Sequence, residues 1–227
     1  MDEGTATPAV FAKRLSASTA AHLRTLGTVQ SYKRGTPVLH AGEAGDSVVL
    51  LLAGRVKVVA RGRNGSEVVL ALGQPGDLYG EMAVLGERPR MADVVAVEDV
   101  EVRRISAEAF RRFLADYDDA RRETLMMNFA RLAYANEQRL VQTQGDVTYR
   151  LARRLLDLVA ENGRPVGDGG WQIDVPWSQR DLAQSLPASE TSVDLALRRL
   201  RELNLVDTRY RTMVILDLPA LRAFTQS

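Results

Sequence analysis

The sequence predicts an α+β fold in three parts: an N-terminal β-roll (a jelly roll), a long helix and a C-terminal winged helix-turn-helix. Three observations predict it. Ten of the 17 glycines fall within residues 35–86, between valine-rich runs, which is typical of antiparallel strands. Residues 87–144 contain no glycine, which favours helices. After Gly145, helical patterns with polar caps alternate with short strand patterns.

The β-roll is predicted over about residues 28–105. Residues 47–60 form an apolar run with a turn at Ala53-Gly54, and Asn64-Gly65 is a strong two-residue hairpin signal before the next run. A further turn is predicted at Pro75-Gly76-Asp77. Three further short strands are predicted over residues 68–72, 94–97 and 100–103.

Two helices are predicted next. Ser106 can cap a helix that ends near Leu114, and residues 118–144 read as one long helix without glycine or proline. Six of its residues recur at alternating spacings of three and four, as in a coiled coil. This seam consists of Met126, Phe129, Ala133, Asn136, Leu140 and Thr143. We expect it to form the interface of a homodimer, the alternative being a helix that packs on its own domain.

The last third predicts a winged helix-turn-helix. A helix over residues 147–161 precedes a glycine-rich loop (162–170) and a short strand with Trp171, Ile173 and Val175. Ser178 and Ser189 can cap two short helices around a break at Pro187. Two strands, a turn at 208–212 and a last helix capped by Asp217 follow. The expected domains are residues 1–117, 118–145 and 146–227.

In this order, the three parts resemble the Crp–Fnr family of bacterial transcription regulators over essentially the whole chain. The matching residues are Gly35, Gly42-Glu43, Asp46, Gly54-Arg55-Val56, Pro75-Gly76-Asp77, Gly80-Glu81-Met82-Ala83 and Pro89-Arg90. The resemblance implies a cyclic-nucleotide-binding sensor domain, a homodimer joined along the long helices, and a two-fold site on double-stranded DNA. It also implies RNA polymerase as a further partner.

The expected ligand residues are Gly80, Glu81, Met82, Ala83, Arg90, Met91 and Asn136. A tight glycine turn exposes backbone N–H groups to an anion, and the planar fork of Arg90 suits a phosphate. Glu81 only accepts hydrogen bonds, so it suits a ribose hydroxyl and can also orient Arg90. Met91 replaces the family's usual Ser or Thr, and Ala135-Asn136 replaces a Thr-Ser pair that reaches the adenine.

The effector therefore stays open at this point. The first expectation is cAMP or cGMP. We expect the bound nucleotide to contact the long helix near Asn136 and to shift the hinge segment that follows this helix. A cyclic dinucleotide is the second. The third is no ligand, with Glu81 and Arg90 forming only a structural ion pair.

The expected DNA-binding residues depart from the family pattern. Glu190 and Thr191 stand where the family commonly has Arg and Glu, although Glu can accept from cytosine N4. Residues 146–227 hold 11 Arg and 11 Asp or Glu, an unusually neutral balance for a DNA-binding domain. An interaction protein with no DNA role is therefore the second hypothesis. The candidate residues are Gln179, Arg180, Ser189, Glu190, Thr191, Ser192, Asp194, Arg198, Arg209 and Arg211.

Composition excludes several function classes. The chain of 227 residues has no cysteine, which excludes disulfides, thiolate zinc sites and the family's iron–sulfur branch. Its two histidines offer little to a metal centre or a catalytic triad, and no nucleophile stands with a base, so we expect neither a metal nor an enzyme. The net charge is +1, and no segment has the length of a membrane span. We expect a soluble, cytoplasmic protein.

Overall fold

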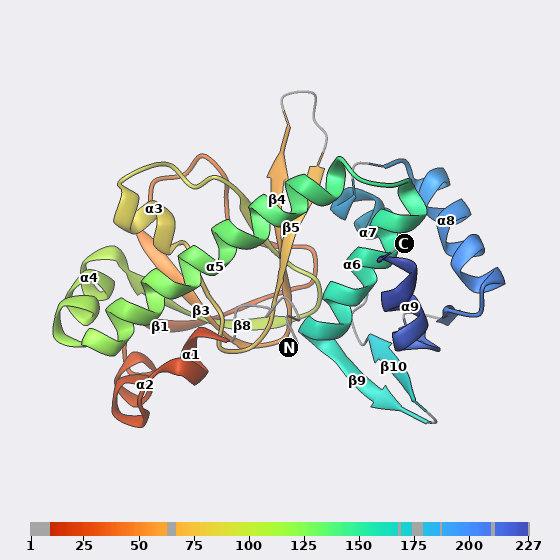
Figure 1. Cartoon of the computed structure of the whole chain (residues 1–227). Coiled ribbons are helices and arrows are strands. Elements are labelled where there is room, and N and C mark those ends of the chain that lie inside the picture. Colours follow the sequence, from red (N-terminus) through yellow and green to blue (C-terminus); the bar gives the residue numbers. More distant parts are fainter. Residues whose placement is uncertain are drawn as a thin grey trace. The chain divides into compact units, whose positions relative to one another are not determined.

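The computed structural model describes residues 10–62, 67–167, 169–173, 179–186, 188–209 and 212–226, without the side chains of Asn162, Gln179 and Arg209. The described chain forms two compact units, the first ending at Arg131 and the second beginning at Leu132 (Figure 1). The domain boundaries expected at residues 117 and 145 stay a prediction.

The first unit is a roll of short antiparallel strands. Its strands are β1 (Thr28–Tyr32), β2 (Pro37–Leu39), β3 (Ser47–Ala53), β4 (Val56–Arg61), β5 (Glu67–Gly73), β6 (Leu78–Tyr79), β7 (Asp93–Ala96) and β8 (Val100–Ser106). Among the described residues they form two four-stranded sheets, in the orders β1-β8-β3-β6 and β2-β7-β4-β5. The β-roll predicted from the glycine and valine pattern is confirmed.

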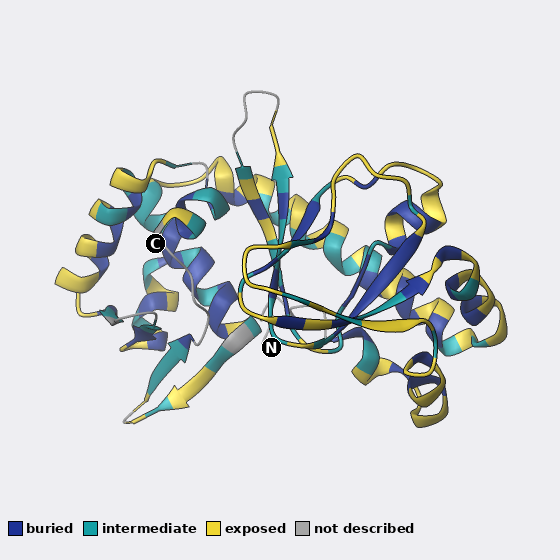
Figure 2. Cartoon of the chain, turned by 180° about the vertical axis from the view of Figure 1, so that it is seen from behind, coloured by how far each residue is buried: buried dark blue, intermediate teal, exposed yellow. Residues whose placement is uncertain are grey.

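The strand β3 shows why the roll has two cores. Successive side chains of a strand point to opposite faces. Val49 and Leu51 pack with residues of both sheets, inside the roll. Val48 and Leu50 pack on the other face, against the helices. The burial of this strand on both faces explains its unbroken apolar sequence (Figure 2).

Two predicted hairpins define the roll. Gly54 makes the turn between β3 and β4 with a φ of 75°, and a Cβ there would lie 2.5 Å from the carbonyl oxygen of Asp99. Only glycine meets both requirements. The strands β4 and β5 pair as predicted, with Val56 opposite Gly73, whereas the Asn64-Gly65 turn lies outside the described residues.

The helices of the first unit cover one face of the roll. They are α1 (Phe11–Arg14), α2 (Ala17–Leu23), α3 (Glu81–Gly86), α4 (Ala107–Asp116) and the start of α5 (Asp118–Gln142). Ser106 caps α4 by accepting a hydrogen bond from the N–H of Ala109, as predicted. Phe110 and Phe113 of α4 are fully buried against the sheet.

The second unit combines helices with one antiparallel sheet. Its elements after α5 are α6 (Val147–Asn162), β9 (Gly163–Val166), β10 (Gly170–Ile173), α7 (Gln179–Ser185), α8 (Glu190–Glu202), β11 (Val206–Arg209), β12 (Thr212–Ile215) and α9 (Leu218–Phe224). The predicted caps Ser189 and Asp217 are confirmed. The buried face of α8 consists of Val193, Ala196, Leu197 and Leu200, as predicted.

One predicted loop is wrong. Residues 163–166 form the strand β9, which pairs with β10 so that Ile173 lies opposite Gly163. The sheet order β11-β12-β10-β9 puts β9 at an edge, the position in a sheet where a proline such as Pro165 is tolerated. The predicted two-stranded wing is thus part of a four-stranded sheet. Val175, Ser178 and Pro187 lie outside the described residues.

Within the part of the chain that the structure describes, no helix is both long enough and apolar enough to cross a bilayer.

Candidate functional site

Arg90 is the centre of the candidate ligand site. Its side chain is buried, and its Nη2 donates to Asp46 Oδ1 and to the carbonyl oxygen of Ser47, both at 2.9 Å. The atoms Nε and Nη1 are buried and have no hydrogen-bond partner among the described residues. Since unpaired buried donors are costly, these two nitrogens favour an acceptor that the chain itself does not supply.

The backbone around Arg90 is fixed by the loop before β3. The N–H of Arg90 donates to the carbonyl oxygen of Glu43 at 2.9 Å, and its own carbonyl oxygen accepts from Gly42 at 2.8 Å. Gly45 lies so close to α3 that a Cβ there would stand 2.4 Å from the carbonyl of Ala83. The motif residues Gly42-Glu43 therefore have a role here: they hold the arginine in place.

Gly80 completes this arrangement. Its φ is 91°, and a Cβ would lie 2.6 Å from Nη1 of Arg90 and 2.9 Å from the carbonyl oxygen of Ser47. The turn before α3 therefore needs a glycine for its backbone conformation and for the space that Arg90 fills.

Glu81 has a different partner from the one expected. Its carboxylate is 1% exposed and receives Nη1 of Arg131 at 2.7 Å, so Glu81 neither orients Arg90 nor forms an ion pair with it. Arg131 also donates to the carbonyl oxygen of Leu78 and lies over the ring of Tyr79, 5.2 Å from its centroid. Both expectations are wrong because α5 supplies a closer cation than the loop after α3.

Burial governs the ionisation of the groups beside Arg131. It raises the pKa of Asp77, and it raises the pKa of Tyr79 well above its usual value. Burial disfavours the charged form of Arg131 itself, but Glu81, Tyr79 and Asp77 together outweigh this and raise the guanidinium pKa. Arg131 is thus a permanent cation, and the sequence analysis missed it because nothing in the local pattern links residue 131 to residue 81.

The other expected ligand residues are spread over different surroundings. Ala83 is buried, whereas Met82 and Met91 are 49% and 69% exposed. Asn136 is exposed on α5. The structure therefore brings Gly80 and Arg90 together, and no contact among the described residues links Asn136 to them.

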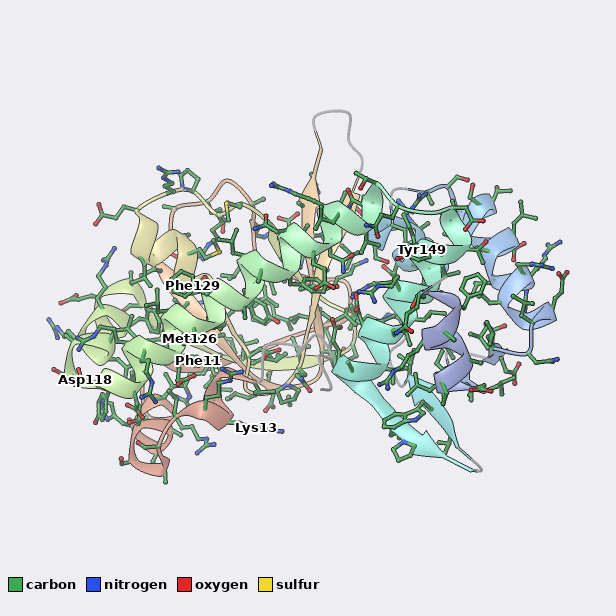
Figure 3. The ribbon with its side chains drawn as sticks, in the orientation of Figure 1. Phe11, Lys13, Asp118, Met126, Phe129 and Tyr149 are labelled. Atoms are coloured by element: carbon green, nitrogen blue, oxygen red, sulfur yellow. The ribbon has the colours of Figure 1, made fainter. Side chains whose placement is uncertain are left out.

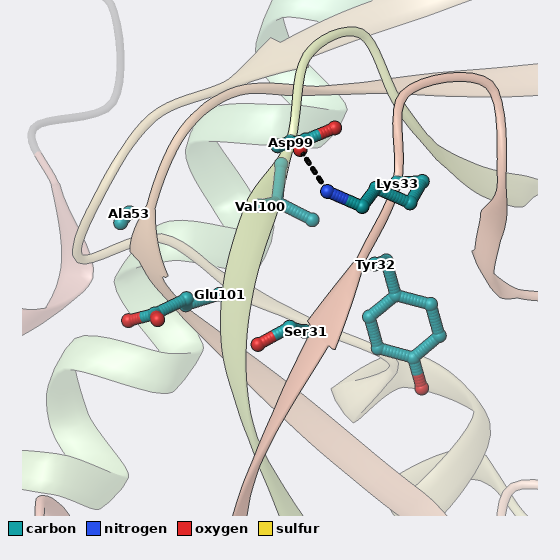
Figure 4. A pocket seen from close by; sticks show the side chains of 7 residues that line it. All are labelled: Ser31, Tyr32, Lys33, Ala53, Asp99, Val100 and Glu101. Atoms are coloured by element: carbon teal, nitrogen blue, oxygen red, sulfur yellow. Dashed lines mark hydrogen bonds and ion pairs between the residues drawn. The ribbon is translucent and has the colours of Figure 1, made fainter.

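A separate shallow pocket lies at one end of β1, β3 and β8 (Figure 4). It has a volume of about 410 Å³ and is lined by Ser31, Tyr32, Lys33, Ala53, Asp99, Val100 and Glu101. Its cation, Lys33, pairs with Asp99 at 2.6 Å, which leaves the exposed carboxylate of Glu101 uncompensated within the pocket. This acidic lining does not suit a phosphate.

The six seam residues are all exposed in the single chain, five of them on α5 and Thr143 directly after its last residue. Figure 3 labels Met126 and Phe129 about one turn apart on this helix, and they are 47% and 56% exposed. Leu125 and Leu132 flank them and are also more than half exposed. One face of α5 is therefore apolar, and the described residues of the chain do not cover it.

A buried charge cluster lies between α6 and the C-terminal part of α5. Arg154 is 3% exposed, donates to the hydroxyl of Tyr134 at 2.6 Å and lies 3.4 Å from Glu161. Asp157 accepts from Gln138 at 3.0 Å. Burial raises the pKa of Asp157, although Arg154 opposes this, and burial also raises the pKa of Tyr134.

The candidate DNA-binding residues lie mainly on α7 and α8. Arg180, Glu190, Thr191 and Arg198 are exposed, and Asp194 is half-buried. Arg198 pairs with Asp194 at 2.7 Å. Ser189 and Ser192 are 2.9 Å apart at their hydroxyls, in the cap of α8. The side chains of Gln179 and Arg209, and all of Arg211, lie outside the described residues.

Two family models match the chain in the order of its units. Residues 29–117 match the cyclic nucleotide-binding domain, and residues 149–224 match the Crp-like helix-turn-helix domain.

Curated relatives match over most of their length. A CRP-like cAMP-activated global transcriptional regulator of Mycobacterium tuberculosis is 28% identical over 197 residues, which is 87% of each chain. The cAMP-activated global transcriptional regulator CRP of Pasteurella multocida is 28% identical over 192 residues, which is 82% of this chain and 89% of the relative.

Solved structures share the fold. FixK2 from Bradyrhizobium japonicum superposes with a TM-score of 0.75 at 20% identity, covering 88% of this chain and 97% of FixK2. The c-di-GMP responsive global regulator CLP of Xanthomonas campestris gives 0.70 at 21% identity, covering 88% and 99%. Since the two family models follow each other along one chain and full-length regulators match across both, the chain belongs to the Crp–Fnr family of DNA-binding transcription regulators.

Proposed function

We propose that the protein is a dimeric transcription regulator whose effector is a cyclic nucleotide, with its phosphate bound by Arg90. The observation that supports this most is that two side-chain nitrogens of Arg90, Nε and Nη1, have no partner among the described residues although the residue is only 6% exposed. A phosphate accepts hydrogen bonds from such donors, whereas the carboxylate of Asp46 engages only Nη2 of the same guanidinium. The cAMP-activated relatives from two genera are consistent with this chemistry.

The neighbouring residues can serve the rest of a nucleotide. The first N–H groups of a helix have no partner within the helix, so the backbone at Met82 and Ala83 suits a phosphate oxygen. A carboxylate accepts several hydrogen bonds, so Glu81 can take a ribose hydroxyl while it keeps Arg131. The family resemblance assigns Asn136 to the base and puts Met91 where the family's Ser or Thr touches the phosphate or base.

The DNA contacts are proposed on the α7–α8 face. Arg180 and Arg198 suit phosphates, and Glu190 and Thr191 suit base edges. We also propose that Gln179, Ser189, Ser192, Asp194, Arg209 and Arg211 contact the DNA. Because an acidic residue stands at the start of α8, we expect a half-site unlike the family's usual one. A second chain, paired along the seam of α5, would make the DNA site two-fold.

Calorimetry of the purified protein with cAMP, cGMP and cyclic di-GMP tests the effector. We expect one cyclic mononucleotide to bind, and Arg90→Ala to abolish the heat of binding while the far-UV spectrum stays unchanged. Unchanged affinity in Arg90→Ala would overturn the assignment of the phosphate site. Binding of cyclic di-GMP alone would transfer the proposal to a cyclic dinucleotide, the effector class of the c-di-GMP responsive regulator CLP.

A second candidate function is a protein-contact module without DNA readout. The acidic residues Glu190 and Asp194 on α8 favour it, since both repel phosphates. A gel-shift assay on upstream DNA at physiological salt decides between the two. A specific shift that competitor DNA does not remove supports the regulator, and its absence with every nucleotide supports the module.

A further inference from the structure

Arg104 of β8 is a second guanidinium close to the proposed phosphate site. Its Nε donates to Gln30 Oε1 at 3.0 Å, and its Nη2 donates to the hydroxyl of Tyr32 at 3.0 Å and to the carbonyl oxygen of Val38 at 2.6 Å. Its Nη1 donates to Ser47 Oγ at 2.9 Å. Every nitrogen of this group therefore has a protein acceptor, and Arg104 is not itself a ligand for an anion.

The hydroxyl of Ser47 connects Arg104 to Arg90. Arginine can only donate, so Ser47 Oγ accepts both from Arg104 and, at 3.3 Å, from Nη2 of Arg90. A hydroxyl has one proton, and the proton of Ser47 points to Asp46 Oδ1 at 2.8 Å. The direction of each hydrogen bond is thus set by the chemistry of its donor.

Asp46 closes the network. Its Oδ1 receives both the Ser47 hydroxyl and Nη2 of Arg90. The hydrogen bond from Ser47 and the charges of Arg90 and Arg104 lower the pKa of Asp46. The carboxylate therefore stays ionised near neutral pH, and Nη2 of Arg90 has three acceptors.

We propose that Arg104 is a positioning residue: through the Ser47 hydroxyl it holds Nη2 of Arg90, so that Nε and Nη1 of Arg90 remain available to an anionic effector. This inference rests on the proposed function, in which Arg90 binds the phosphate of a cyclic nucleotide. Pre-organised donors bind more tightly because less side-chain freedom is lost on binding.

Ser47→Ala tests the connection most directly, since it removes the hydroxyl and leaves the other three hydrogen bonds of Arg104 in place. We expect a 5- to 20-fold weaker affinity for cAMP by calorimetry, roughly the effect of one lost hydrogen bond to a charged group. Ser47→Thr keeps a hydroxyl at this position and should restore most of the affinity, which a purely structural role would not predict.

Arg104→Gln and Arg103→Gln form a matched pair. The two arginines are consecutive on β8, and Arg103 donates instead to the carbonyl oxygen of Leu26. We expect Arg104→Gln to weaken cAMP binding at least fivefold and Arg103→Gln to change it less than twofold. Thermal melting shows whether each variant is folded at the titration temperature.

The outcomes separate the two levels of the argument. A wild-type protein that binds no cyclic nucleotide overturns the proposed function and this inference with it. A wild-type protein that binds cAMP through Arg90, with affinity unchanged in Ser47→Ala and Arg104→Gln, overturns the positioning role alone. Equal losses in Arg103→Gln and Arg104→Gln would also overturn it.

Discussion

At the scale of single residues, the close approach of Gly45 to Ala83 links the packing of a loop to the candidate site. A Cβ at Gly45 would lie 2.4 Å from a backbone carbonyl, so Gly45→Ala must shift either the loop or α3. We expect a loss of about 1–3 kcal/mol in the free energy of unfolding, the usual cost of overpacking, measured by urea titration.

Gly86 provides the control for this prediction. A Cβ there meets no atom within 4 Å, and its φ is not in the left-handed region. Gly86→Ala should therefore leave the urea midpoint unchanged or raise it slightly. Equal destabilisation by both alanines would show that contact with Ala83 is not the cause.

Asp119 makes a pH-dependent contribution to the free energy of unfolding. Its carboxylate accepts from the N–H of Ser16 at 2.9 Å and from the hydroxyl of Thr19 at 2.8 Å, joining the starts of α2 and α5. These hydrogen bonds, the Ser16 N–H first, lower the pKa of Asp119 in the folded state. Its stabilisation is therefore fully present above the unfolded-state pKa of about 4 and is lost as the pH falls through the lower folded-state value.

Asp119→Ala should lower the urea midpoint at pH 7, and the difference from wild type should narrow progressively below pH 4. Asp118→Ala is the matched control, because Asp118 is exposed and pairs with the exposed Arg121. A gap between Asp119→Ala and wild type that stays constant down to pH 2 would contradict the assignment.

At the scale of elements, the cluster around Arg154 holds α6 to α5. Asp157 and Glu161 lie close to this buried cation, so removing it leaves two carboxylates in a poorly solvated site. We expect Arg154→Met to cost about 3–5 kcal/mol at pH 7, the usual penalty for breaking a buried ion pair. The loss should shrink as the pH falls through the raised pKa of Asp157, because protonation removes the uncompensated charge.

The comparison variant is Arg153→Met. Arg153 pairs with Glu137 at 2.9 Å, but both side chains are about one-third exposed. Its loss should therefore stay below about 1 kcal/mol in the same urea titration. If the two variants lose the same stability, burial is not what gives Arg154 its importance.

The elements themselves were largely readable from sequence, because their signals are local. The caps Ser106, Ser189 and Asp217 lie next to the helices they begin. The strand β9 was missed because Gly163-Arg164-Pro165-Val166 has no strand-like pattern and is held by pairing with β10. The candidate site was readable only in part, since Arg131 and Arg104 reach partners about 50 positions away in the sequence.

At the scale of the whole molecule, the uncovered seam of α5 predicts self-association. Phe129 is 56% exposed in the single chain, so Phe129→Asp should leave each protomer folded while placing a charge in the proposed interface. Sedimentation velocity should show a dimer for wild type and a monomer for the variant. A variant that still sediments as a dimer would place the interface elsewhere.

Ala135→Asp is the control for the seam. Ala135 is also exposed on α5, but it lies roughly a third of a turn round the helix from Phe129. The charge there should leave the dimer intact. Equal dissociation by both variants would indicate a general effect of acidic residues on α5.

The dimer proposed along α5 would also make the concentration of the protein part of its regulation. If a second copy covers this apolar face, stability and assembly depend on mass action. Below the dissociation constant of the dimer, the amount of dimer, and with it the occupancy of a two-fold DNA site, rises with the square of the protomer concentration. A modest change in expression would then produce a steeper change in transcription, before any effector binds.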